Sequence, residues 1–466
     1  MRLLVLTQSF APVFEGGTER VARAQARALA AAGHAVRVVG AVAPERAGTF
    51  EVDGLPVHLI AEEPPAGALD ALVAQRLWLE RPARRDAVLA LAAEHGPFDA
   101  VHVQHFASLS LGLVPHFAGV GARVVVSLHD LFATCARFFR DPPDPAVTCP
   151  VPGAELDPCA RCIAPEAGPL APDALLAAVE ERARRMRAEL DAAHALVAPS
   201  AVHARRLEAL LGYPEGRVHV VPNGLVGELP ARPAPSPARA PLRVLHFGHR
   251  ARTKGALELC RAADAAARRT GARIELVLMG AELEAGFDAE LRAACGAAQL
   301  ELRGAYTPDE LAAEAARAHV AAFPSKALES YGLVVDEALA LGLPVLVSGD
   351  RVPGEAAAGN SDGCGNAGLR GALQGALVER LECSTLSALP ASEGHPGRAL
   401  PRPLDDAALA AWADALAALA RELEPGPDGR AKAPSLRAWR AAIPPRMPGP
   451  ADAAAALLPL LCPDSA

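Results

Sequence analysis

Short apolar runs rich in β-branched residues alternate along the first half of this chain with longer alanine-rich stretches of helical period. Each run is short enough to be a buried strand. The runs lie at residues 3–6, 36–39, 57–60, 100–103, 124–128, 196–198 and 218–221. Strands that alternate with helices are typical of a parallel sheet covered by helices. We therefore predict an α/β domain over residues 1–227.

A proline-rich segment at residues 228–241 interrupts this pattern, and its composition favours an extended linker. The alternation then restarts and predicts a second sheet domain over residues 242–434. Its candidate strands lie at residues 244–247, 274–279, 300–302, 320–323 and 345–347. Two domains of this kind predict two Rossmann-like halves.

Two later segments depart from the alternation. Residues 348–403 are rich in glycine, serine and proline, and we predict a loop-rich insertion there. Residues 405–423 have the period of an amphipathic helix. After a second proline-rich break, we expect residues 435–466 to form a C-terminal segment that packs back toward the first domain.

Charge and length narrow the class of protein. The chain has 466 residues, enough to bury two or three cores, and a net charge of -8. Nucleic-acid binding depends on neutralising phosphates with clustered cations, and the chain has no long cationic block. We therefore exclude nucleic acid as a partner.

Membrane insertion is not expected from the apolar runs. Only four apolar residues, Leu3 to Leu6, precede the polar Thr7 and Gln8, too few for a secretory signal. Uninterrupted apolar runs stay below the roughly 18 residues of a membrane-spanning helix. We expect a cytoplasmic protein. The arginine-rich stretch 178–190 offers peripheral contact with the inner face of the membrane, but its glutamates favour a solvated helix face instead.

Paired glycines, Gly16 and Gly17, stand between the first strand and the first helix. Glycine lets the backbone approach a ligand closely, and the following helix start offers unpaired N–H groups to an anion. The same glycines would also serve a tight strand-to-helix turn. The pattern leaves a phosphate site and a simple turn equally open.

A cationic loop follows the first strand of the second domain. The letters HFGHRARTKG place Arg250, Arg252 and Lys254 between glycines and just before a helix. Cations in such a loop can hold a diphosphate. A solvated surface loop is the alternative, and we favour the diphosphate site.

A second candidate segment, with two glutamates and a glycine, lies at residues 323–349 and runs from a strand end through a loop and a helix into the next strand. Glu329 precedes a predicted helix and Glu337 lies inside it, about 12 Å apart if the helix were continuous. That separation matches the length of an extended nucleotide sugar. Tyr331, Gly332 and Leu333 form the predicted helix start, which favours a phosphate. An ordinary solvated helix remains the alternative for Glu337.

Four of the nine cysteines, Cys135, Cys149, Cys159 and Cys162, gather in a cysteine-rich insertion that we predict at residues 131–170. The last two have the two-residue gap of a metal clip, and four thiolates can close a tetrahedral zinc site. We favour a structural metal, zinc before iron–sulfur, over unliganded cysteines or redox pairs. Disulfides are less expected in a reducing compartment.

Taken together, six motifs make the chain similar to the family-4 retaining glycosyltransferases of the GT-B fold. They are GGTERVARAQARALAAAGHAV at 16–36, DAVHVQH at 99–105, SLHD at 127–130, VPNG at 221–224, GHRARTKG at 248–255 and ESYGLVVDE at 329–337. The resemblance covers residues 1–350. It implies two Rossmann-like domains facing across a cleft, with an acceptor-side domain first and a nucleotide-sugar-binding domain second.

The resemblance also implies roles for single residues. Glu329 would contact the transferred sugar and Glu337 the ribose, while Lys254 and an arginine would hold the diphosphate. His129 would face the reacting centre from the first domain. One departure concerns the cation: the family usually has arginine directly after the glycine, and here His249 stands there with Arg250 following.

By the same resemblance the chemistry is a metal-independent transfer, with retained configuration, from a nucleotide-diphosphate sugar. The implied acceptor is a glycan, a lipid or a small molecule in cell-envelope polysaccharide or glycoconjugate synthesis. Two other readings share the fold: a non-catalytic sugar-nucleotide scaffold, and a sugar-nucleotide epimerase. The paired glutamates argue against the epimerase, and the presence of Glu329, Lys254 and His129 together argues against the scaffold.

Overall fold

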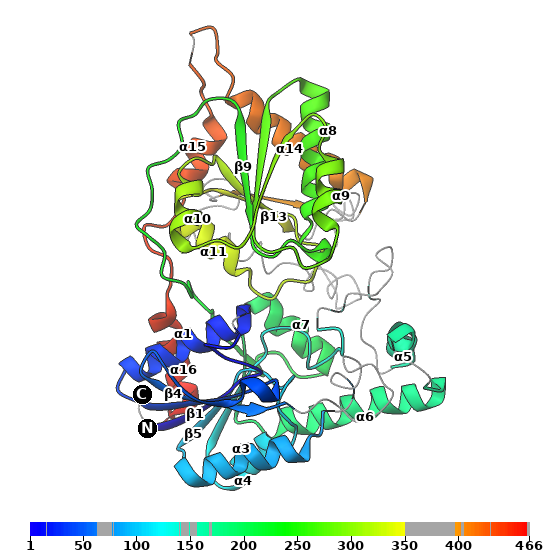
Figure 1. Cartoon of the computed structure of the whole chain (residues 1–466), viewed down its shortest axis with the longest axis vertical. Helices are drawn as coiled ribbons and strands as arrows, with labels where there is room; N and C mark the ends of the chain where they lie inside the picture. The colour runs from blue at the N-terminus through cyan, green and yellow to red at the C-terminus, as the bar shows by residue number, and fades with distance from the viewer. Residues whose placement is uncertain are drawn as a thin grey trace. The chain divides into compact units, whose positions relative to one another are not determined.

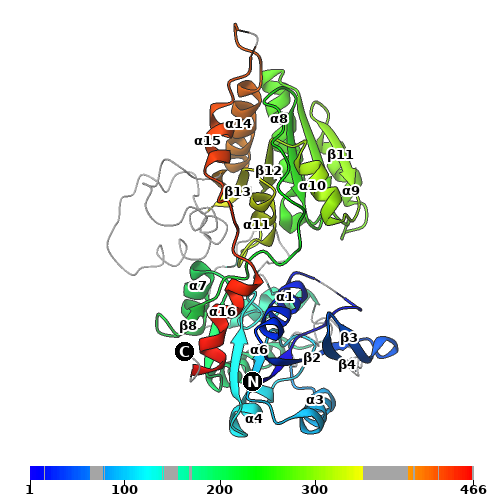
Figure 2. The same ribbon diagram turned by 90° about the vertical axis from the view of Figure 1, so that its left-hand side faces the viewer.

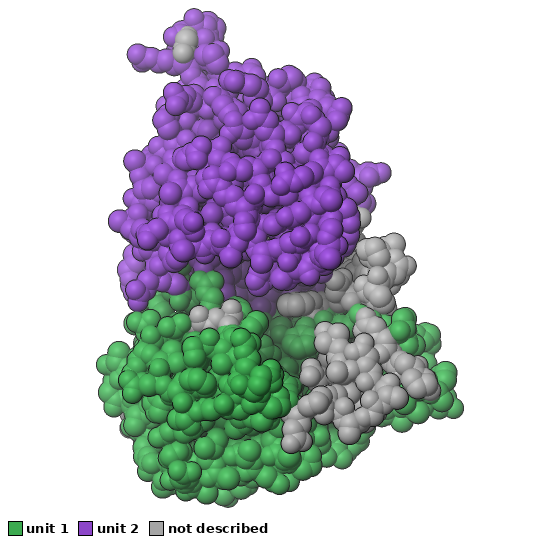
Figure 3. Space-filling model, in the orientation of Figure 1, with its two compact units in different colours: residues 1–226, 448–466 green, residues 227–447 purple. Residues whose placement is uncertain are grey.

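The computed structural model of the chain divides into two compact units. It describes residues 1–14, 16–62, 77, 79–138, 140, 149, 156–166, 170–349, 397–401, 405–428 and 430–463. Unit 1 comprises residues 1–226 and 448–466, and unit 2 comprises residues 227–447. Figure 3 colours unit 1 green and unit 2 purple.

Unit 1 is built on an eight-stranded sheet in the order β3-β4-β2-β1-β5-β6-β7-β8. Its strands are β1 (Arg2–Leu6), β2 (Ala35–Val42), β3 (Gly48–Val52), β4 (Leu55–Ala61), β5 (Ala100–Val103), β6 (Arg123–Ser127), β7 (Ala195–Ala198) and β8 (Val218–Val220). All neighbours pair in parallel except β3 and β4, which pair antiparallel. The strand order reverses between β1 and β5, which is where ligands bind in open α/β sheets.

Helices cover this sheet (Figure 1). They are α1 (Gly17–Ala31), α3 (Pro82–His95), α4 (Leu113–Gly119), α5 (Asp157–Ile163), α6 (Pro172–Asp191), α7 (Ala201–Leu211) and α16 (Pro450–Leu461), with 3-10 turns η1 (Pro44–Arg46) and η2 (Ala164–Glu166). The apolar stripe of α1 packs with Leu457 and Leu461 of α16 on the strands. The chain thus returns to the first sheet, and Leu225 N donates to Pro448 O at 2.7 Å where it does so.

Unit 2 is built on a six-stranded sheet, parallel throughout, in the order β11-β10-β9-β12-β13-β14. Its strands are β9 (Leu242–Phe247), β10 (Ile274–Met279), β11 (Gln299–Arg303), β12 (Val320–Phe323), β13 (Val345–Gly349) and β14 (Gly397–Pro401). This is the strand order of a dinucleotide-binding Rossmann sheet. Its reversal point lies between β9 and β12.

The core of unit 2 joins this sheet to helices from both ends of its sequence. The helices are α8 (Ala256–Thr270), α9 (Phe287–Ala294), α10 (Pro308–Ala315), α11 (Leu333–Ala340), α14 (Asp406–Glu422) and α15 (Pro434–Ala441), with the 3-10 turn η3 (Arg252–Lys254). Leu259 and Ala263 of α8 and Trp412 and Leu416 of α14 are fully buried in one apolar cluster with strand residues. Figure 2 shows α8 and α14 beside the strands of this unit.

The α/β fold with two Rossmann-like domains is confirmed, but two strands escaped prediction. β3 is an edge strand with mostly exposed side chains, so it lacks a buried apolar run. β14 lies inside the predicted loop-rich insertion 348–403, which is therefore wrong at its ends: β13 extends to Gly349, and β14 occupies 397–401 with Leu400 buried. Residues 350–396 and 402–403 of that prediction lie outside the described residues.

The predicted returning segment 435–466 divides between the two units. Residues 435–447 belong to unit 2, because Leu436 of α15 is buried in that unit's core. Only the part from residue 448 joins unit 1. The predicted linker 228–241 falls within unit 2, where Arg232 Nε donates to Ala340 O at 3.2 Å. None of the described helices is both long and apolar enough to span a bilayer.

Candidate functional site

Two loops at the carboxyl edge of the unit 2 sheet are joined by an ion pair. Lys254 follows β9 and Glu329 follows β12, the two strands that flank the reversal point. The distance from Lys254 Nζ to Glu329 Oε1 is 2.8 Å, and Ser325 Oγ donates to the same oxygen at 2.7 Å. The Lys254 side chain is 39% exposed, so its ammonium remains accessible to a ligand.

Backbone contacts hold these loops at fixed separation. The carbonyl oxygen of Thr253 accepts from Lys326 N at 2.8 Å and from Ala327 N at 3.2 Å. Gly255, with φ +74°, lies so close that an added Cβ would be 1.9 Å from Pro324 O. Only glycine tolerates both that dihedral and that approach. The glycine that ends the cationic loop therefore allows the two loops to meet.

The two arginines of the cationic loop form ion pairs with acidic residues other than Glu329. The Arg250 guanidinium is buried and binds both carboxylate oxygens of Asp288 at 2.7 Å, and it also donates to two backbone carbonyls. Arg252 pairs with Glu284 at 2.9 Å and with Glu290. Of the three cations that the sequence singles out in this loop, Lys254 is the one that the structure joins to Glu329.

The second predicted feature, the start of α11, is shaped by a left-handed glycine. Gly332 is the N-cap residue at φ 89°, and Leu333 is the first helical residue. Tyr331 is buried, and its hydroxyl donates to Asp336 Oδ2 at 2.8 Å. Because α11 begins at Leu333, the helix is not continuous from Glu329, and the 12 Å separation predicted on that basis does not apply. Glu337 lies inside the helix and is 4% exposed.

A buried histidine lies at the carboxyl end of β9. His246 Nδ1 donates to Ala322 O at 2.8 Å, and Nε2 is buried without a hydrogen-bond partner among the residues that the structure describes. Burial, with smaller contributions from the nearby cations Lys254 and Arg250, lowers the pKa of His246 to about 4. This side chain is therefore neutral at physiological pH, and the positive charge at this edge resides on the lysine.

In unit 1, His129 follows β6 and belongs to a buried network of uncharged groups. The distance from His129 Nε2 to Gln104 Oε1 is 2.5 Å, and Gln104 Nε2 donates to Gln25 Oε1 at 2.8 Å. His102 Nε2 lies 2.8 Å from Ser127 Oγ. Burial lowers the pKa of His129 to about 4 and that of His102 to about 3. Both imidazoles are therefore neutral near pH 7.

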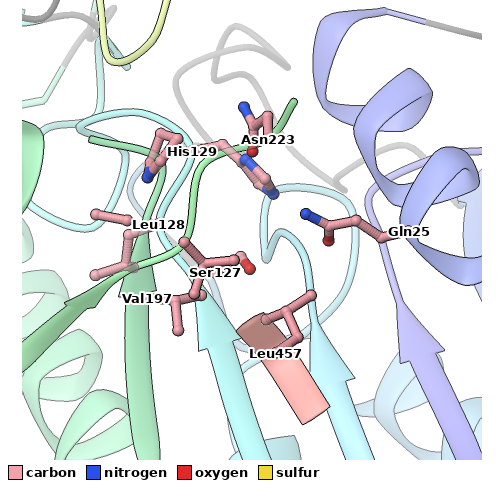
Figure 4. A pocket seen from close by; sticks show the side chains of 10 residues that line it. Gln25, Ser127, Leu128, His129, Val197, Asn223 and Leu457 are labelled. Atoms are coloured by element: carbon pink, nitrogen blue, oxygen red, sulfur yellow. The ribbon is translucent and has the colours of Figure 1, made fainter. Parts of the chain in front are cut away.

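His129 also borders a small cavity at the carboxyl ends of β6 and β7. The polar lining comes from Gln25, Ser127, His129 and Asn223, and the apolar floor includes Leu457 of α16. Figure 4 shows Gln25 and His129 turned toward one another, with Asn223 beside the imidazole. Because all of these residues belong to unit 1, this half of the predicted site is assembled within one unit.

The glycine pair Gly16 and Gly17 begins α1, as predicted, but a carboxylate already occupies the helix start. Glu19 Oε2 accepts from Gly16 N at 2.9 Å, and Gln8 Nε2 donates to Glu19 Oε1 at 2.7 Å. Glu19 is 1% exposed. A buried carboxylate repels a phosphate, so this contact favours the tight-turn reading over the phosphate reading for these two glycines.

The four clustered cysteines lie in unit 1 without disulfides. Cys159 and Cys162 share α5, Arg137 N donates to Cys135 Sγ at 3.3 Å, and Arg140 Nη2 donates to Cys149 Sγ at 3.3 Å. Burial raises the pKa of Cys159 and of Cys162, with smaller contributions from neighbouring thiols, and outweighs the lowering by Arg140 at Cys159 and by Arg137 at Cys162. In the described part of the chain, no three histidine, cysteine or acidic side chains are grouped to hold a metal ion. Structural zinc stays a prediction, and so does the outline of the insertion at residues 131–170.

Several polar residues in these networks were not predicted as site residues. Gln25 lies on the buried face of α1, Gln104 directly follows β5, and Ser325 follows β12. A glutamine within an apolar helix stripe is a signal that could have been used, because buried amides need hydrogen-bond partners. Asn223 belongs to the VPNG motif at 221–224, but no function was predicted for it from the sequence.

Two family models match the chain. The model described as Glycosyltransferase Family 4 matches residues 15–226, and the model described as Family 4 Glycosyltransferase in conflict systems matches residues 167–351. Together they span residues 15–351 of 466. No curated protein sequence matches the chain.

Solved structures share the fold at low sequence identity. Sucrose-phosphate synthase from Thermosynechococcus elongatus is 18% identical with a TM-score of 0.58, covering 95% of each chain. The catalytic domain of starch synthase IV from Arabidopsis thaliana, bound to ADP and acarbose, is 13% identical with a TM-score of 0.58, covering 98% of each chain. A glycosyltransferase from Rickettsia africae is 11% identical with a TM-score of 0.53, covering 99% of this chain and 98% of its own.

Proposed function

This chain belongs to the family-4 glycosyltransferases, and on that basis we propose that it moves a sugar from a nucleoside-diphosphate donor to an acceptor with retained configuration. Unit 2 binds the donor and unit 1 contributes His129 to the acceptor side. The observation that carries the donor assignment is the pairing of Lys254 with Glu329 between the loops after β9 and β12.

The geometry of this pair explains how it would hold a diphosphate. An ammonium carries three N–H donors, and among the described residues Glu329 accepts one of them, which leaves two for phosphate oxygens. Lys254 also directly precedes Gly255, which caps the start of α8, and Gly332 caps α11. Helix starts offer N–H groups and a positive dipole end to an anion.

The chemical step follows from charge. As the bond between sugar and diphosphate breaks, negative charge grows on the leaving group, and fixed donors that are already oriented lower the barrier most. Lys254 and the two helix starts would supply these donors without a metal ion. A phosphate oxygen leaving on the same face as the incoming acceptor would take the acceptor's proton, which accounts for retention.

Glu329 and Glu337 complete the proposed donor site. Glu329 is fixed by Lys254 and Ser325, and we assign it to a hydroxyl of the transferred sugar. Glu337 is assigned to the ribose by the resemblance of ESYGLVVDE at 329–337 to the family's motif. The starch synthase domain of the same fold is described as bound to ADP, a nucleoside diphosphate, and this supports the donor class. The acceptor is assigned only by class, as a glycan, lipid or small molecule of envelope polysaccharide synthesis.

The proposal is tested by a panel of nucleotide sugars. Ligands that bind only the folded state raise the melting temperature in proportion to the logarithm of their excess over Kd. We expect at least one nucleoside-diphosphate sugar to stabilise the chain and to release its nucleotide slowly as the sugar is transferred. An α-linked donor should give an α-linked product. Stabilisation without transfer to any acceptor of the three classes would favour a sugar-nucleotide scaffold. A product of inverted configuration would contradict the retaining assignment.

A further inference from the structure

Gln104 connects His129 to the interior of unit 1 through a chain of buried hydrogen bonds. Its side chain is 0% exposed, and it lies between His129 and Gln25. Gln104 Oε1 faces His129 Nε2 at 2.5 Å, while Gln104 Nε2 faces Gln25 Oε1 at 2.8 Å. A carboxamide oxygen can only accept, so His129 Nε2 must carry the hydrogen in this contact.

We infer that Gln104 is a positioning residue that holds His129 as the neutral Nε2–H tautomer and leaves Nδ1 as a hydrogen-bond acceptor. Within the part of the chain that the structure describes, Nδ1 has no hydrogen-bond partner. The effect on sugar transfer rests on the proposed function. The tautomer itself does not, because it is a property of the chain alone.

The orientation of the Gln104 amide is coupled to two neighbouring side chains. Gln25 Oε1 accepts from it, and His102 Nδ1 lies 3.3 Å from the same nitrogen. His102 in turn reaches Ser127 through its other nitrogen at 2.8 Å. Turning the Gln104 amide over would place oxygen against oxygen at Gln25, so the whole chain would have to reverse together. The buried series of hydrogen bonds therefore acts as a unit that sets one tautomer of His129.

The electrostatic surroundings keep the imidazole uncharged. Titratable groups from four segments face His129: His102 on β5, His105 after that strand, Asp130 beside it in sequence, and His203 on α7. Asp130 raises the pKa of His129, but burial is the larger effect and lowers it to about 4. Hydrogen bonding, and not a counter-charge, therefore decides which ring nitrogen carries the proton near pH 7.

The direct test is the tautomer of His129 in the wild-type chain. Selective ¹⁵N labelling of histidine with long-range ¹H–¹⁵N correlation distinguishes the two neutral tautomers and the imidazolium, and His129→Asn assigns the resonance. We expect an Nε2–H imidazole from pH 6 to pH 8. An Nδ1–H imidazole or an imidazolium in that range would overturn the inference. Because no donor or acceptor is added, this outcome is independent of the proposed function.

A charge change at Gln104 tests the consequence. In Gln104→Glu the carboxylate accepts from Nε2–H and stabilises the imidazolium, so the pKa of His129 should rise and Nδ1 should lose its acceptor role at low pH. We expect the acidic limb of kcat/KM to move upward by about one pH unit or more, which corresponds to a hydrogen-bonded charge partner. Gln299→Glu, at the exposed start of β11, carries the same charge change and should leave the profile unchanged.

A shorter amide separates positioning from folding. Gln104→Asn keeps the donor and acceptor groups but withdraws them by one methylene, so we expect a mixture of His129 tautomers and a lower kcat/KM. The melting temperature of Gln104→Asn should equal that of Gln104→Glu. If Gln104→Glu and Gln104→Asn both leave the His129 resonances and the pH profile as in wild type, Gln104 does not set the tautomer and the inference fails.

Discussion

The two units share the topology of an open parallel sheet, yet the side chains at their carboxyl edges differ in charge. At the edge of unit 1, His129, Gln104 and Gln25 are buried and uncharged, and each is fixed by a hydrogen bond. At the edge of unit 2, Lys254 and Glu329 form a partly exposed ion pair. Two sheets that both reverse strand order at their centre therefore support two kinds of site, which shows that the loops after the strands, and not the sheet, decide the chemistry.

Each kind of site suits a different part of the proposed reaction. A neutral imidazole and carboxamides match the hydrogen-bonding groups of sugars and other uncharged acceptors. An ammonium at a pair of helix starts matches a diphosphate. The comparison is sharpened by changes that affect one unit and leave the other as it is.

Removal of the unit 2 ammonium should have the largest effect. We expect Lys254→Ala to lower kcat/KM for transfer about 100- to 1,000-fold, because a fixed donor to the developing charge is lost. Steady-state kinetics with the donor that stabilises wild type checks this. Lys432→Ala, a surface lysine change in the same unit, is the matched control and should leave kcat/KM unchanged. Wild-type turnover in Lys254→Ala would remove the charged half of the comparison.

Acid should destabilise unit 1 more than unit 2. Burial lowers the pKa of His102 and His203 to about 3 and that of His129 to about 4, whereas in unit 2 it lowers the pKa of His246 to about 4. These histidines are neutral when folded but bind protons below pH 6.5 when unfolded. Their contribution to stability is complete above pH 6.5 and is lost as the pH falls from 6.5 toward 4.

The size of this loss follows from linkage. At pH 5.5 the loss of folding stability is on the order of 1 kcal/mol for each such histidine, so the three in unit 1 together cost about three times as much as His246. Hydrogen exchange measured by mass spectrometry at pH 7 and 5.5, corrected for intrinsic rates, should show the larger loss of protection in β5, β6 and α7. Equal losses in the two units would contradict the neutral character assigned to the unit 1 network.

A glycine pair tests whether the unit 2 loops must touch. Gly255 and Gly271 flank α8 with φ of +74° and +70°, but an added Cβ meets Pro324 O at 1.9 Å only at Gly255, and open space at Gly271. We expect Gly271→Ala to cost about 1 kcal/mol for the left-handed conformation, and Gly255→Ala to cost about 2 kcal/mol more for the clash. Denaturant unfolding checks both values. Equal destabilisation would mean that the close approach of the loops is not required.

The smallest effect on transfer is expected from the cysteine substitutions. Their effect on zinc content should differ between the two units. If the predicted zinc is bound by Cys135, Cys149, Cys159 and Cys162, reduced wild-type protein should contain about one zinc per chain, by elemental analysis. Cys159→Ser with Cys162→Ser should lose it, while Cys260→Ser, a buried cysteine of α8 in unit 2, should keep it. Protein prepared anaerobically without zinc or iron would rule out the metal.

Periodicity predicted most of the fold, because the central strands of both sheets are buried on both faces and read as short apolar runs. β3 was missed because its side chains are mostly exposed. β14, with the sequence GRALP, was missed because it lies at the end of a segment without the alternation that marks a strand. The return of α16 to the first sheet was expected, but Leu436 belongs to the other core, and no local pattern tells which core an apolar helix will join.

The site was predictable where charge and glycine stand at strand ends. Lys254 and Glu329 were identified from such positions, and the structure brings them together. Arg250 has the same sequence signal but pairs with Asp288, and that pairing depends on the packing of α9 against the loop. Gln104 and Gln25 lie 79 positions apart, so their contact depends on the sheet being formed and could not be read from either segment.

The most direct test of the charged edge of unit 2 compares nucleoside diphosphates with the matching monophosphates by titration calorimetry, in wild type and in Lys254→Ala. If Lys254 holds the diphosphate, wild type should bind the diphosphate at least about tenfold more tightly, a difference of about 1.4 kcal/mol, and Lys254→Ala should bind the two equally. An undiminished preference for the diphosphate in Lys254→Ala would show that the charge is held elsewhere and would contradict the central claim.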